Sequence, residues 1–299
     1  MVSIICSETG YGENPEIVAA SPDMFKTFWP DVKGSYFFRN RRLYLEFMHT
    51  NGGRIYYIPD GSRFNPPFIL VGNWRSRADI TALWHVKGEG EVKRSLVIAA
   101  AWFGFNDKSG KFVTKPLKER EALQFEGWGF EQAYKIVLLE KEQRWEPSST
   151  HTKEGVDIVR FKKKYLDDVL DLDATAFDDF WRLDAHAMET IATSCYRNTF
   201  LLARRDDDIL GYVAGGVNGR LGYLQRLGVH GEHQEEGIGE ILVRHILRTL
   251  QGMGATTIMV NTQDENKAAL GLYRKLGFKE TQGPRFIMYC TPHSLERNR

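Results

Sequence analysis

Short runs of apolar or alternating residues in the second half of the chain predict a series of strands. Residues 156–161 (VDIVRF) alternate between apolar and polar, and residues 221–229 (LGYLQRLGV) are mainly apolar. Residues 198–204 and 209–215 are also apolar, and they flank the polar run 205–208. This arrangement is typical of a hairpin, in which two strands are joined by a charged turn.

Helical spacing of apolar residues predicts the elements between these strands. A long helical region is expected from about residue 165 to 194, and an amphipathic helix follows the strand 221–229. A buried strand is then expected at 257–260, a second helix after Asn261, and a last strand at 285–290. The apolar face of the amphipathic helix consists of Ile238, Ile241, Leu242, Ile246, Leu247 and Leu250. The order of elements predicts an α/β domain with a mixed, twisted sheet flanked by helices.

The first half of the chain contains a similar order of elements. Residues 111–140 predict a strand, a helix, a Gly-Phe pair and a strand, as residues 257–290 do. Aligning Gly129 with Gly277 gives an offset of 277 − 129 = 148, about half of the chain. Glycine after a helix is also a common stop signal, so the pairing has a simpler explanation. We favour a duplicated domain.

A polar stretch separates the two halves. Residues 143–155 (QRWEPSSTHTKEG) contain proline and a Ser-Ser-Thr run, and no strand or helix pattern crosses them. We therefore expect a linker there. The expected domains are residues 1–145 and residues 156–299, and each is long enough to bury a core of its own.

Composition narrows the class of protein. The 299 residues carry 40 basic and 39 acidic side chains, so a net charge of +1 gives no long-range field that would attract nucleic acid or anionic lipid. No stretch approaches the length of apolar sequence that spans a bilayer, and the N-terminus lacks the pattern of a signal peptide. The three cysteines, Cys6, Cys195 and Cys290, are widely spaced and suggest neither a disulfide framework nor a zinc site. We expect a cytoplasmic protein without nucleic-acid, membrane or metal partners.

A glycine-containing turn is the sharpest candidate for chemistry. Residues 234–239 (QEEGIG) lie between the strand 221–229 and the amphipathic helix. Glycines at a helix start let the backbone approach an anion closely, and the first N–H groups and the helix dipole attract it. The turn is therefore suited to a pyrophosphate, although a Gly-x-Gly before a helix is also common in ordinary tight turns.

Three motifs occur in order along the second half. They are Leu-Gly-Val at the end of the strand 221–229, Gln-x-x-Gly-x-Gly at 234–239, and Asn-x-x-Ala-x-x-x-Tyr-x-x-x-Gly-Phe at 266–278. In this combination and spacing the chain resembles the GNAT superfamily, the Gcn5-related acyltransferases that use acetyl-coenzyme A. The resemblance covers about residues 156–290 and is fainter before them, where it suggests a tandem arrangement with a second GNAT-like domain.

The resemblance implies a role for each motif. The strand end would bind the pantetheine arm and the thioester carbonyl, and the turn and the helix start after it would hold the pyrophosphate. Asn266 would steady the cofactor, and the hydroxyl of Tyr273 would protonate the departing thiolate. A phenol with a pKa of about 10 remains protonated at neutral pH and can serve as this acid. The residues implied in cofactor binding are Leu227, Gly228, Val229, Gln234, Glu235, Glu236, Gly237, Ile238, Gly239, Glu240, Asn266 and Tyr273.

Two features depart from the family pattern. Glu235 and Glu236 place carboxylates in the turn that would hold a pyrophosphate, where many family members have non-acidic residues. In the first half, the offset of 148 puts Phe125 opposite Tyr273 and Lys118 opposite Asn266, and no phosphate turn is present. We therefore expect the first domain to be a degenerate, non-catalytic copy.

These observations predict an acetyl-coenzyme A-dependent N-acetyltransferase whose second domain transfers the acetyl group directly to a small-molecule or peptide amine. The alternative is a non-catalytic acyl-coenzyme A binding or sensing protein, which the two glutamates of the turn favour. Asp184 and Glu189 are guesses for the general base. His230 and His233 lie close together, but without a third ligand we expect them to be solvated.

Overall fold

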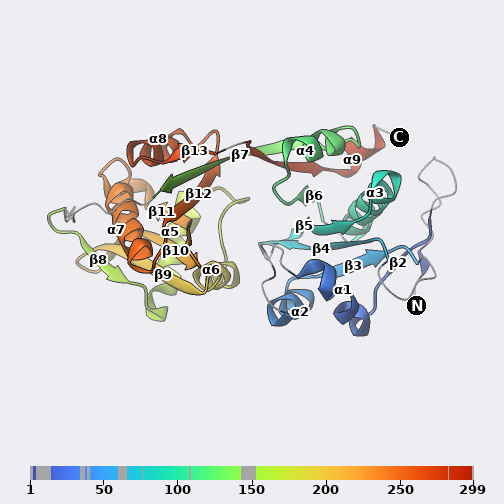
Figure 1. Ribbon diagram of the computed structural model, residues 1–299, viewed down its shortest axis with the longest axis horizontal. Helices are drawn as coiled ribbons and strands as arrows, with labels where there is room; N and C mark the ends of the chain where they lie inside the picture. The colour runs from blue at the N-terminus through green and yellow to red at the C-terminus, as the bar shows by residue number, and fades with distance from the viewer. Residues whose placement is uncertain are drawn as a thin grey trace. The chain divides into compact units, whose positions relative to one another are not determined.

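The computed structural model describes residues 3–4, 15–33, 38, 41–59, 66–75, 77–107, 109–142, 153–281 and 283–297. Most of the expected linker, residues 143–152, lies outside this set, as does Cys6. The chain divides into two compact units. Unit 1 consists of residues 1–135 and 285–299, and unit 2 of residues 136–284. Figure 1 labels the elements of both.

Unit 1 has a mixed sheet with the strand order β1-β2-β3-β4-β5-β6-β14, followed by the first part of β7. The pair β5·β6 is parallel, and the other neighbours whose register is defined are antiparallel. Its strands are β1 Ser3–Ile4, β2 Ile17–Ala19, β3 Arg54–Tyr57, β4 Phe68–Trp74, β5 Arg77–Lys87, β6 Lys111–Thr114, β7 Glu131–Glu142 and β14 Arg285–Cys290. Its helices are η1 Pro22–Met24, α1 Phe25–Val32, α2 Arg41–Thr50, α3 Gly90–Asn106, α4 Glu119–Glu126 and α9 Pro292–Glu296.

Unit 2 has the strand order β7-β12-β11-β10-β9-β8, with β13 beside β7. Only the pair β11·β12 is parallel among its described strand pairs. Its further strands are β8 Asp157–Arg160, β9 Arg197–Arg205, β10 Asp208–Asn218, β11 Leu221–Val229, β12 Thr257–Gln263 and β13 Lys279–Glu280. Its helices are η2 Lys163–Tyr165, α5 Leu166–Ala176, α6 Ala185–Ala192, η3 Gly231–His233, α7 Ile238–Gly252 and α8 Lys267–Lys275.

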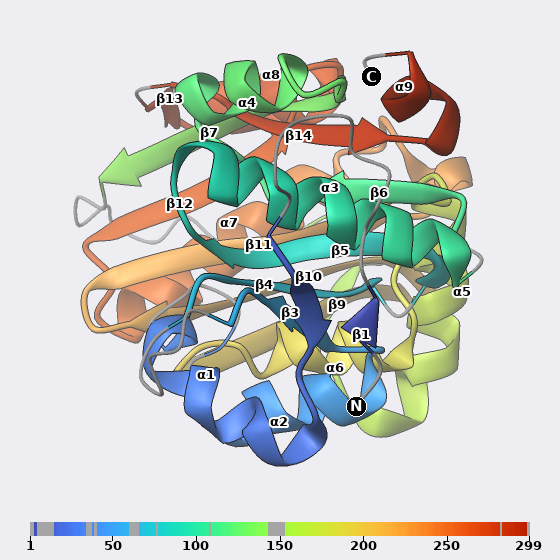
Figure 2. The same ribbon diagram turned by 90° about the vertical axis from the view of Figure 1, so that its right-hand side faces the viewer.

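Helices cover both faces of each sheet, so each unit has two apolar cores. In unit 1, α3 and α4 pack on one face and α1 and α2 on the other (Figure 2). In unit 2, α7 and α8 form one core with the sheet, and α5 and α6 form the second. The α/β class and the mixed sheets are as the sequence predicts. Within the described chain, none of the helices combines the length and apolar composition needed to span a bilayer.

Each unit includes a strand segment from outside the domain that the sequence predicts for it. Unit 2 begins at Ile136 because residues 136–142 of β7 pair with β12 over its whole length, from Ile136↔Gln263 to Glu142↔Thr257. Unit 1 takes β14 from the end of the chain, where it pairs with β6. The predicted boundary near residues 145–156 and the assignment of residues 285–299 to the second domain therefore differ from the compact units. The hydrophobic pattern of a strand does not indicate which sheet receives it.

The helical region predicted at 165–194 is two helices with a loop between them. Phe177 has an extended backbone (φ −134°) and ends α5, and the Asp178 side chain accepts hydrogen bonds from the N–H groups of Phe180 and Trp181. Asp184 then caps α6 by accepting from the N–H of Ala187 at 2.7 Å. Short aspartate side chains compete with helical hydrogen bonding and stabilise such turns.

Candidate functional site

The parallel strands β11 and β12 separate part-way along their length. They are paired only from Leu221↔Thr257 to Tyr223↔Met259, although β11 continues to Val229 and β12 to Gln263. Beyond this point β12 remains paired to β7, and β11 to β10. Among the described strands, none therefore pairs with the edge of β11 that faces β12 from residue 224 onward.

The pairing of β11 with β10 identifies which backbone groups are left open. The N–H of His230 donates to the carbonyl of Leu210 at 2.9 Å, and the register continues with Val229↔Gly211 and Leu227↔Val213. Since backbone groups of alternate residues point to opposite edges of a strand, those of Leu227 and Val229 point away from β10. They face the side on which β12 has separated.

Gly228 has a different role from the cofactor contact predicted for it. It pairs with Tyr212 on β10, so its N–H and C=O are directed to that strand. A Cβ at this position would lie 2.6 Å from Cε1 of Tyr212. The absence of a side chain at Gly228 therefore makes room for the buried Tyr212 ring.

The helix α7 begins beside the end of β11. Gly237 is its N-cap, at φ +82°, and no side chain caps the helix. The first helical bond runs from the N–H of Ile241 to the carbonyl of Gly237, so the N–H groups of Ile238, Gly239 and Glu240 precede the ladder. A Cβ at Gly237 would meet no atom within 4 Å. An uncapped helix start next to open space is suited to an anion.

Among the residues of this turn, Ile238 and Gly239 connect the helix start to the rest of unit 2. The Ile238 side chain is 1% exposed and lies in the apolar core, so only its backbone can face a ligand. A Cβ on Gly239 would lie 3.5–4.0 Å from Leu272 of α8 and from Val229 and Leu227 of β11. The strand end, the helix start and α8 therefore meet at Gly239, while the Gln234 side chain is exposed.

Three basic side chains contact the carboxylate of Glu236. Its Oε2 lies 3.0 Å from Nζ of Lys153 and 3.0 Å from Nη2 of Arg205, and its Oε1 lies 2.9 Å from Nδ1 of His233. Lys153 also donates to the Glu236 carbonyl at 2.7 Å. Hydrogen bonds from His233, Lys153 and Arg205 lower the pKa of Glu236 to about 2. Two basic side chains, Lys153 and Arg205, thus pair with one carboxylate beside the turn.

Glu240 and Glu235, the other two glutamates of the predicted site, differ in their ion pairing. Glu240 is paired with Arg244 at 2.8 Å and with Lys275 at 2.6 Å, and hydrogen bonds from Lys275 and Arg244 lower its pKa. Glu235 is exposed, has a left-handed backbone (φ +64°) and makes no ion pair within the described chain. Of the acidic residues predicted at the cofactor site, Glu235 alone has no ion-pair partner among the residues that the structure describes.

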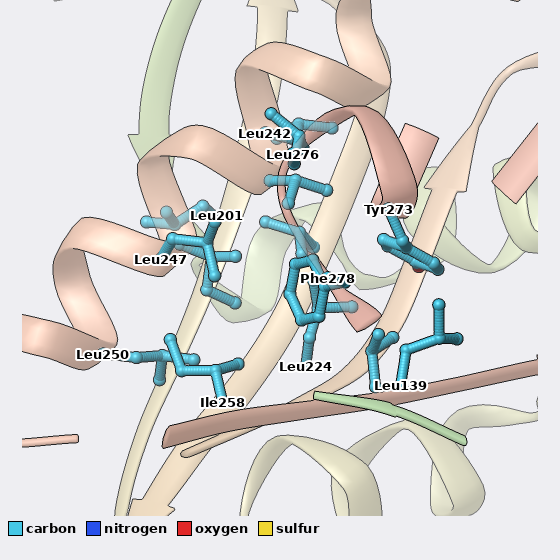
Figure 3. Close-up of a cluster of buried hydrophobic side chains, with 14 of the residues drawn as sticks. Leu139, Leu201, Leu224, Leu242, Leu247, Leu250, Ile258, Tyr273, Leu276 and Phe278 are labelled. Atoms are coloured by element: carbon cyan, nitrogen blue, oxygen red, sulfur yellow. The ribbon is translucent and has the colours of Figure 1, made fainter. Parts of the chain in front are cut away.

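The helix α8 carries Asn266 and Tyr273. Asn266 is the N-cap, and its Oδ1 accepts from the N–H of Ala269 at 3.0 Å. Tyr273 is 4% exposed, and its ring lies 5.6 Å from that of Phe278 in the apolar core (Figure 3). Burial raises the pKa of Tyr273 well above its usual value. Its hydroxyl has no hydrogen-bond partner within the described chain.

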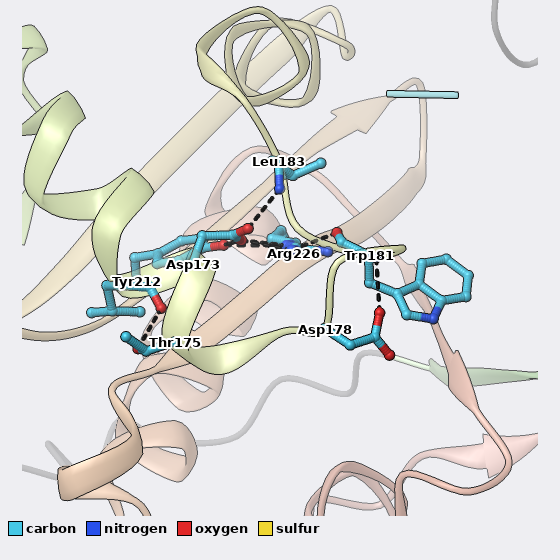
Figure 4. A network of polar contacts seen from close by, with 8 residues as sticks. Asp173, Thr175, Asp178, Trp181, Leu183, Tyr212 and Arg226 are labelled. Carbon is cyan, nitrogen blue, oxygen red and sulfur yellow. Dashed lines mark hydrogen bonds and ion pairs between the residues drawn. The ribbon is translucent and has the colours of Figure 1, made fainter. Parts of the chain in front are cut away.

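The sequence analysis did not predict a buried polar network that includes a residue of β11. Arg226, Asp173 and Tyr212 meet between β11, α5 and β10 (Figure 4). Arg226 is 7% exposed and Asp173 is fully buried. The signal in the sequence is an arginine inside the apolar run LQRLGV, together with an aspartate that follows Leu172 on the apolar face of α5.

Comparison with known proteins agrees with this geometry. The sequence model of the Acetyltransferase (GNAT) family matches residues 166–278, which include both separated strands, the α7 turn and α8. Residues 166–278 form a GNAT domain. The predicted family is therefore confirmed for this part of the chain, and with it the expectation of an acyltransferase fold.

Solved structures show that the fold similarity extends over nearly the whole chain. A GCN5-related N-acetyltransferase from Sphaerobacter thermophilus is 14% identical, with a TM-score of 0.63 over 94% of this chain and 96% of that chain. A tandem GNAT protein from the clavulanic acid biosynthesis pathway is 13% identical, with a TM-score of 0.65 over 92% and 98%. A GCN5-related N-acetyltransferase from Kribbella flavida is 13% identical, with a TM-score of 0.51 over 75% and 86%. The tandem GNAT arrangement of the fold is confirmed.

Proposed function

We propose that unit 2 is an acetyl-coenzyme A-dependent N-acetyltransferase that acts on a small-molecule or peptide amine, and that unit 1 is a non-catalytic copy. The observation that carries this proposal is the separation of β11 from β12. It leaves the backbone groups of Leu227 and Val229 open next to the uncapped start of α7.

The residues present fit the chemical groups of the cofactor. The N–H groups of residues 238–240 and the open space at Gly237 suit a diphosphate. The cations of Lys153 and Arg205 offset the Glu236 carboxylate, so the turn does not repel an anion as two free glutamates would. The amide nitrogen of Asn266 has no partner within the described chain, so it is available to a ligand.

When bound, acetyl-coenzyme A supplies a thioester, whose acyl carbon an amine nitrogen attacks. In our proposal the N–H groups of Leu227 and Val229 stabilise negative charge that develops on the acyl oxygen, a contribution of about 2.7–4 kcal/mol per donor. Tyr273 holds a proton for the departing sulfur. Because burial raises the pKa of this phenol, it stays protonated throughout the neutral range.

The amine must lose a proton before or during the attack. The two residues suggested as the base lie at the start of α6 and on its exposed surface. Asp184 caps α6, and Glu189 is exposed on the same helix. An acceptor with an amine of low pKa needs less help, since deprotonation at pH 7 costs about 1 kcal/mol for an α-amino group and about 4–5 kcal/mol for a lysine.

Binding without turnover is the second candidate. The packing of Tyr273 against Phe278 in the core favours it, because an aromatic residue in this position also has a purely structural use. Thiol release from acetyl-coenzyme A separates the two candidates when it is measured with 2-phenylethylamine, spermidine and a peptide with a free N-terminus. Release above the rate without amine supports transfer, and binding without release supports the second candidate.

Two matched glycine variants test the location of the cofactor site. Gly237 and Gly254 flank α7 at φ +82° and +90°, and neither has a close neighbour that would clash with a Cβ. Gly237→Val and Gly254→Val therefore carry similar backbone strain, but only the first lies at the helix start. We expect the Kd for coenzyme A to rise about tenfold or more in Gly237→Val and less than about twofold in Gly254→Val. Titration calorimetry should give one site per chain, and two sites, or equal effects of both variants, would contradict the proposal.

A further inference from the structure

The buried ion pair of unit 2 lies directly before the open end of β11. Nη2 of Arg226 lies 2.6 Å from Oδ2 of Asp173, and Nε lies 2.9 Å from the same oxygen. Tyr212 donates its hydroxyl hydrogen to this oxygen as well. Arg226 pairs with Ala214 of β10, and the next residue, Leu227, has the open backbone groups.

The same two side chains also bind the loop 177–184, which connects α5 to α6. Arg226 donates from Nη2 to the carbonyl of Trp181 at 2.9 Å, and Oδ1 of Asp173 accepts from the N–H of Leu183 at 2.7 Å. The guanidinium carbon of Arg226 lies 3.4 Å from the centroid of the Phe177 ring. Figure 4 shows the hydrogen bonds of Arg226 with Trp181 and of Asp173 with Leu183.

A buried ion pair contributes little net stability, because the cost of desolvating the two charges offsets their attraction. Such a pair can instead specify one geometry of the groups that it binds. Here each partner also bonds to the loop backbone, Arg226 to the carbonyl of Trp181 and Asp173 to the N–H of Leu183, so the loop position depends on the pair. Half-buried aromatic residues of the loop, Phe180 and Trp181, are held in an edge contact with ring centroids 5.0 Å apart.

We propose that Arg226 is a positioning residue for the acceptor: together with Asp173 it fixes the loop 177–184 against β11, and this loop forms one wall of the site that receives the amine. The inference rests on the function proposed above. It assigns Arg226 no contact with the reacting atoms. Its effect on the reaction passes through the backbone of Trp181 and Leu183.

Two variants of different kinds test the inference in the full chain. Arg226→Lys keeps the positive charge beside Asp173, but its single nitrogen cannot reproduce the bonds to both Asp173 and Trp181. The double variant Asp173→Leu with Arg226→Met removes both charges, which avoids an unpaired buried charge. The matched control is Arg77→Met in unit 1, which removes a half-buried arginine that also lies 2.6 Å from an aspartate, the exposed Asp79.

The first measurement is hydrogen exchange of peptides that cover residues 177–184. We expect exchange at these residues to rise about tenfold or more in both test variants and to stay unchanged in the control. Exchange of peptides from β10 should change much less. If the loop keeps its wild-type protection in the double variant, the anchoring role is overturned.

The second measurement separates the acceptor from the cofactor. With the fastest of 2-phenylethylamine, spermidine and the peptide, we expect Arg226→Lys to raise the KM for the amine about tenfold, and the Kd for coenzyme A to change less than about twofold. Equal changes in both constants would indicate general damage and would overturn the inference. If the wild-type protein transfers acetyl to none of the amines, the proposed function and the acceptor role fail together, while the exchange experiment still decides whether Arg226 and Asp173 anchor the loop.

Discussion

The two units share one scaffold and differ at the positions where chemistry is expected. In unit 1 the parallel strands β5 and β6 are paired from Ile80↔Lys111 to Leu83↔Thr114, and β5 then continues to Lys87 without this partner. The strands β11 and β12 of unit 2 separate in the same way. A long helix without a side-chain cap follows in both units. The separated strands and the helix start therefore do not by themselves distinguish an active copy from an inactive one.

The differences lie in the turn and in the helix after the next strand. Only Gly88 and Glu89 connect β5 to α3, whereas residues 230–237 connect β11 to α7. Phe125 is fully buried and lies 5.1 Å from the Phe130 ring, edge to face, as Tyr273 lies against Phe278. The two halves thus keep the aromatic pair for packing, and only unit 2 adds a hydroxyl.

The end of β5 is also lined differently. Trp84 stacks on Trp74 with ring centroids 6.1 Å apart, and His85 stacks on Phe68 at 5.4 Å. Burial lowers the pKa of His85 to about 4, so this imidazole is neutral at pH 7. Bulky packed rings occupy the strand end in unit 1, where unit 2 has Leu227, Gly228 and Val229. A helix start is therefore a candidate site only together with a suitable strand end and turn before it.

The largest effect should follow from removing residues 285–299, which would break unit 1 and spare unit 2. The deletion removes β14 next to β6, including Ile287, Met288 and Cys290, which are at most 3% exposed. Burying each such side chain contributes roughly 1.5–3 kcal/mol, and a domain is stable by only about 5–15 kcal/mol. We expect hydrogen exchange to rise throughout β4, β5 and α3, while β9 and β10 keep their protection and coenzyme A still binds. Retained protection in β5 would show that unit 1 does not depend on the distant strand.

Tyrosine and phenylalanine can be exchanged at equivalent positions of the two copies to test the role of the hydroxyl. Tyr273→Phe should lower the turnover number about 100-fold while the Kd for coenzyme A changes less than about threefold, because only the proton for the leaving sulfur is lost. Phe125→Tyr, the matched variant in unit 1, should leave turnover unchanged and lower the melting temperature, because it places a hydroxyl in a fully buried position. Steady-state kinetics, calorimetry and thermal unfolding give these values. Wild-type turnover in Tyr273→Phe would remove this residue as the acid.

The smallest effect concerns the turn and appears in the pH dependence of stability. The pKa of Glu236 is lowered from the usual 4.5 to about 2, so its ion pairs stabilise the folded state fully above about pH 4.5 and cease to do so as the pH falls through 2. The melting temperature of Glu236→Gln should lie below that of the wild type at pH 7, and the gap should close between pH 4.5 and 2. The matched control is Glu235→Gln, whose side chain has no ion pair within the described chain, and it should show no gap at either pH. A constant gap for Glu236→Gln would mean that the loss has another origin.

Local patterns in the sequence predict the individual elements of the protein. Alternating or apolar runs identified β8 to β11, helical periodicity identified α7, and the motifs from Leu227 to Phe278 indicated the GNAT domain, which the family comparison confirms. The pairing of Lys118 with Asn266 also anticipated a structural equivalence, since each is the N-cap of its helix. These features depend on neighbours within a few residues, so a linear pattern records them.

The pairing of segments that are far apart in the sequence depends on the tertiary structure. No periodicity indicates that β14 completes unit 1, that residues 136–142 extend the sheet of unit 2, or that Glu236 is neutralised by Lys153 and Arg205. Strand pairing depends on edge availability and the path of the chain, and an ion pair depends on a separation of a few ångströms between residues far apart in sequence. The same holds for Arg226 and Asp173, whose charges are tolerated in the core only because the fold brings them together.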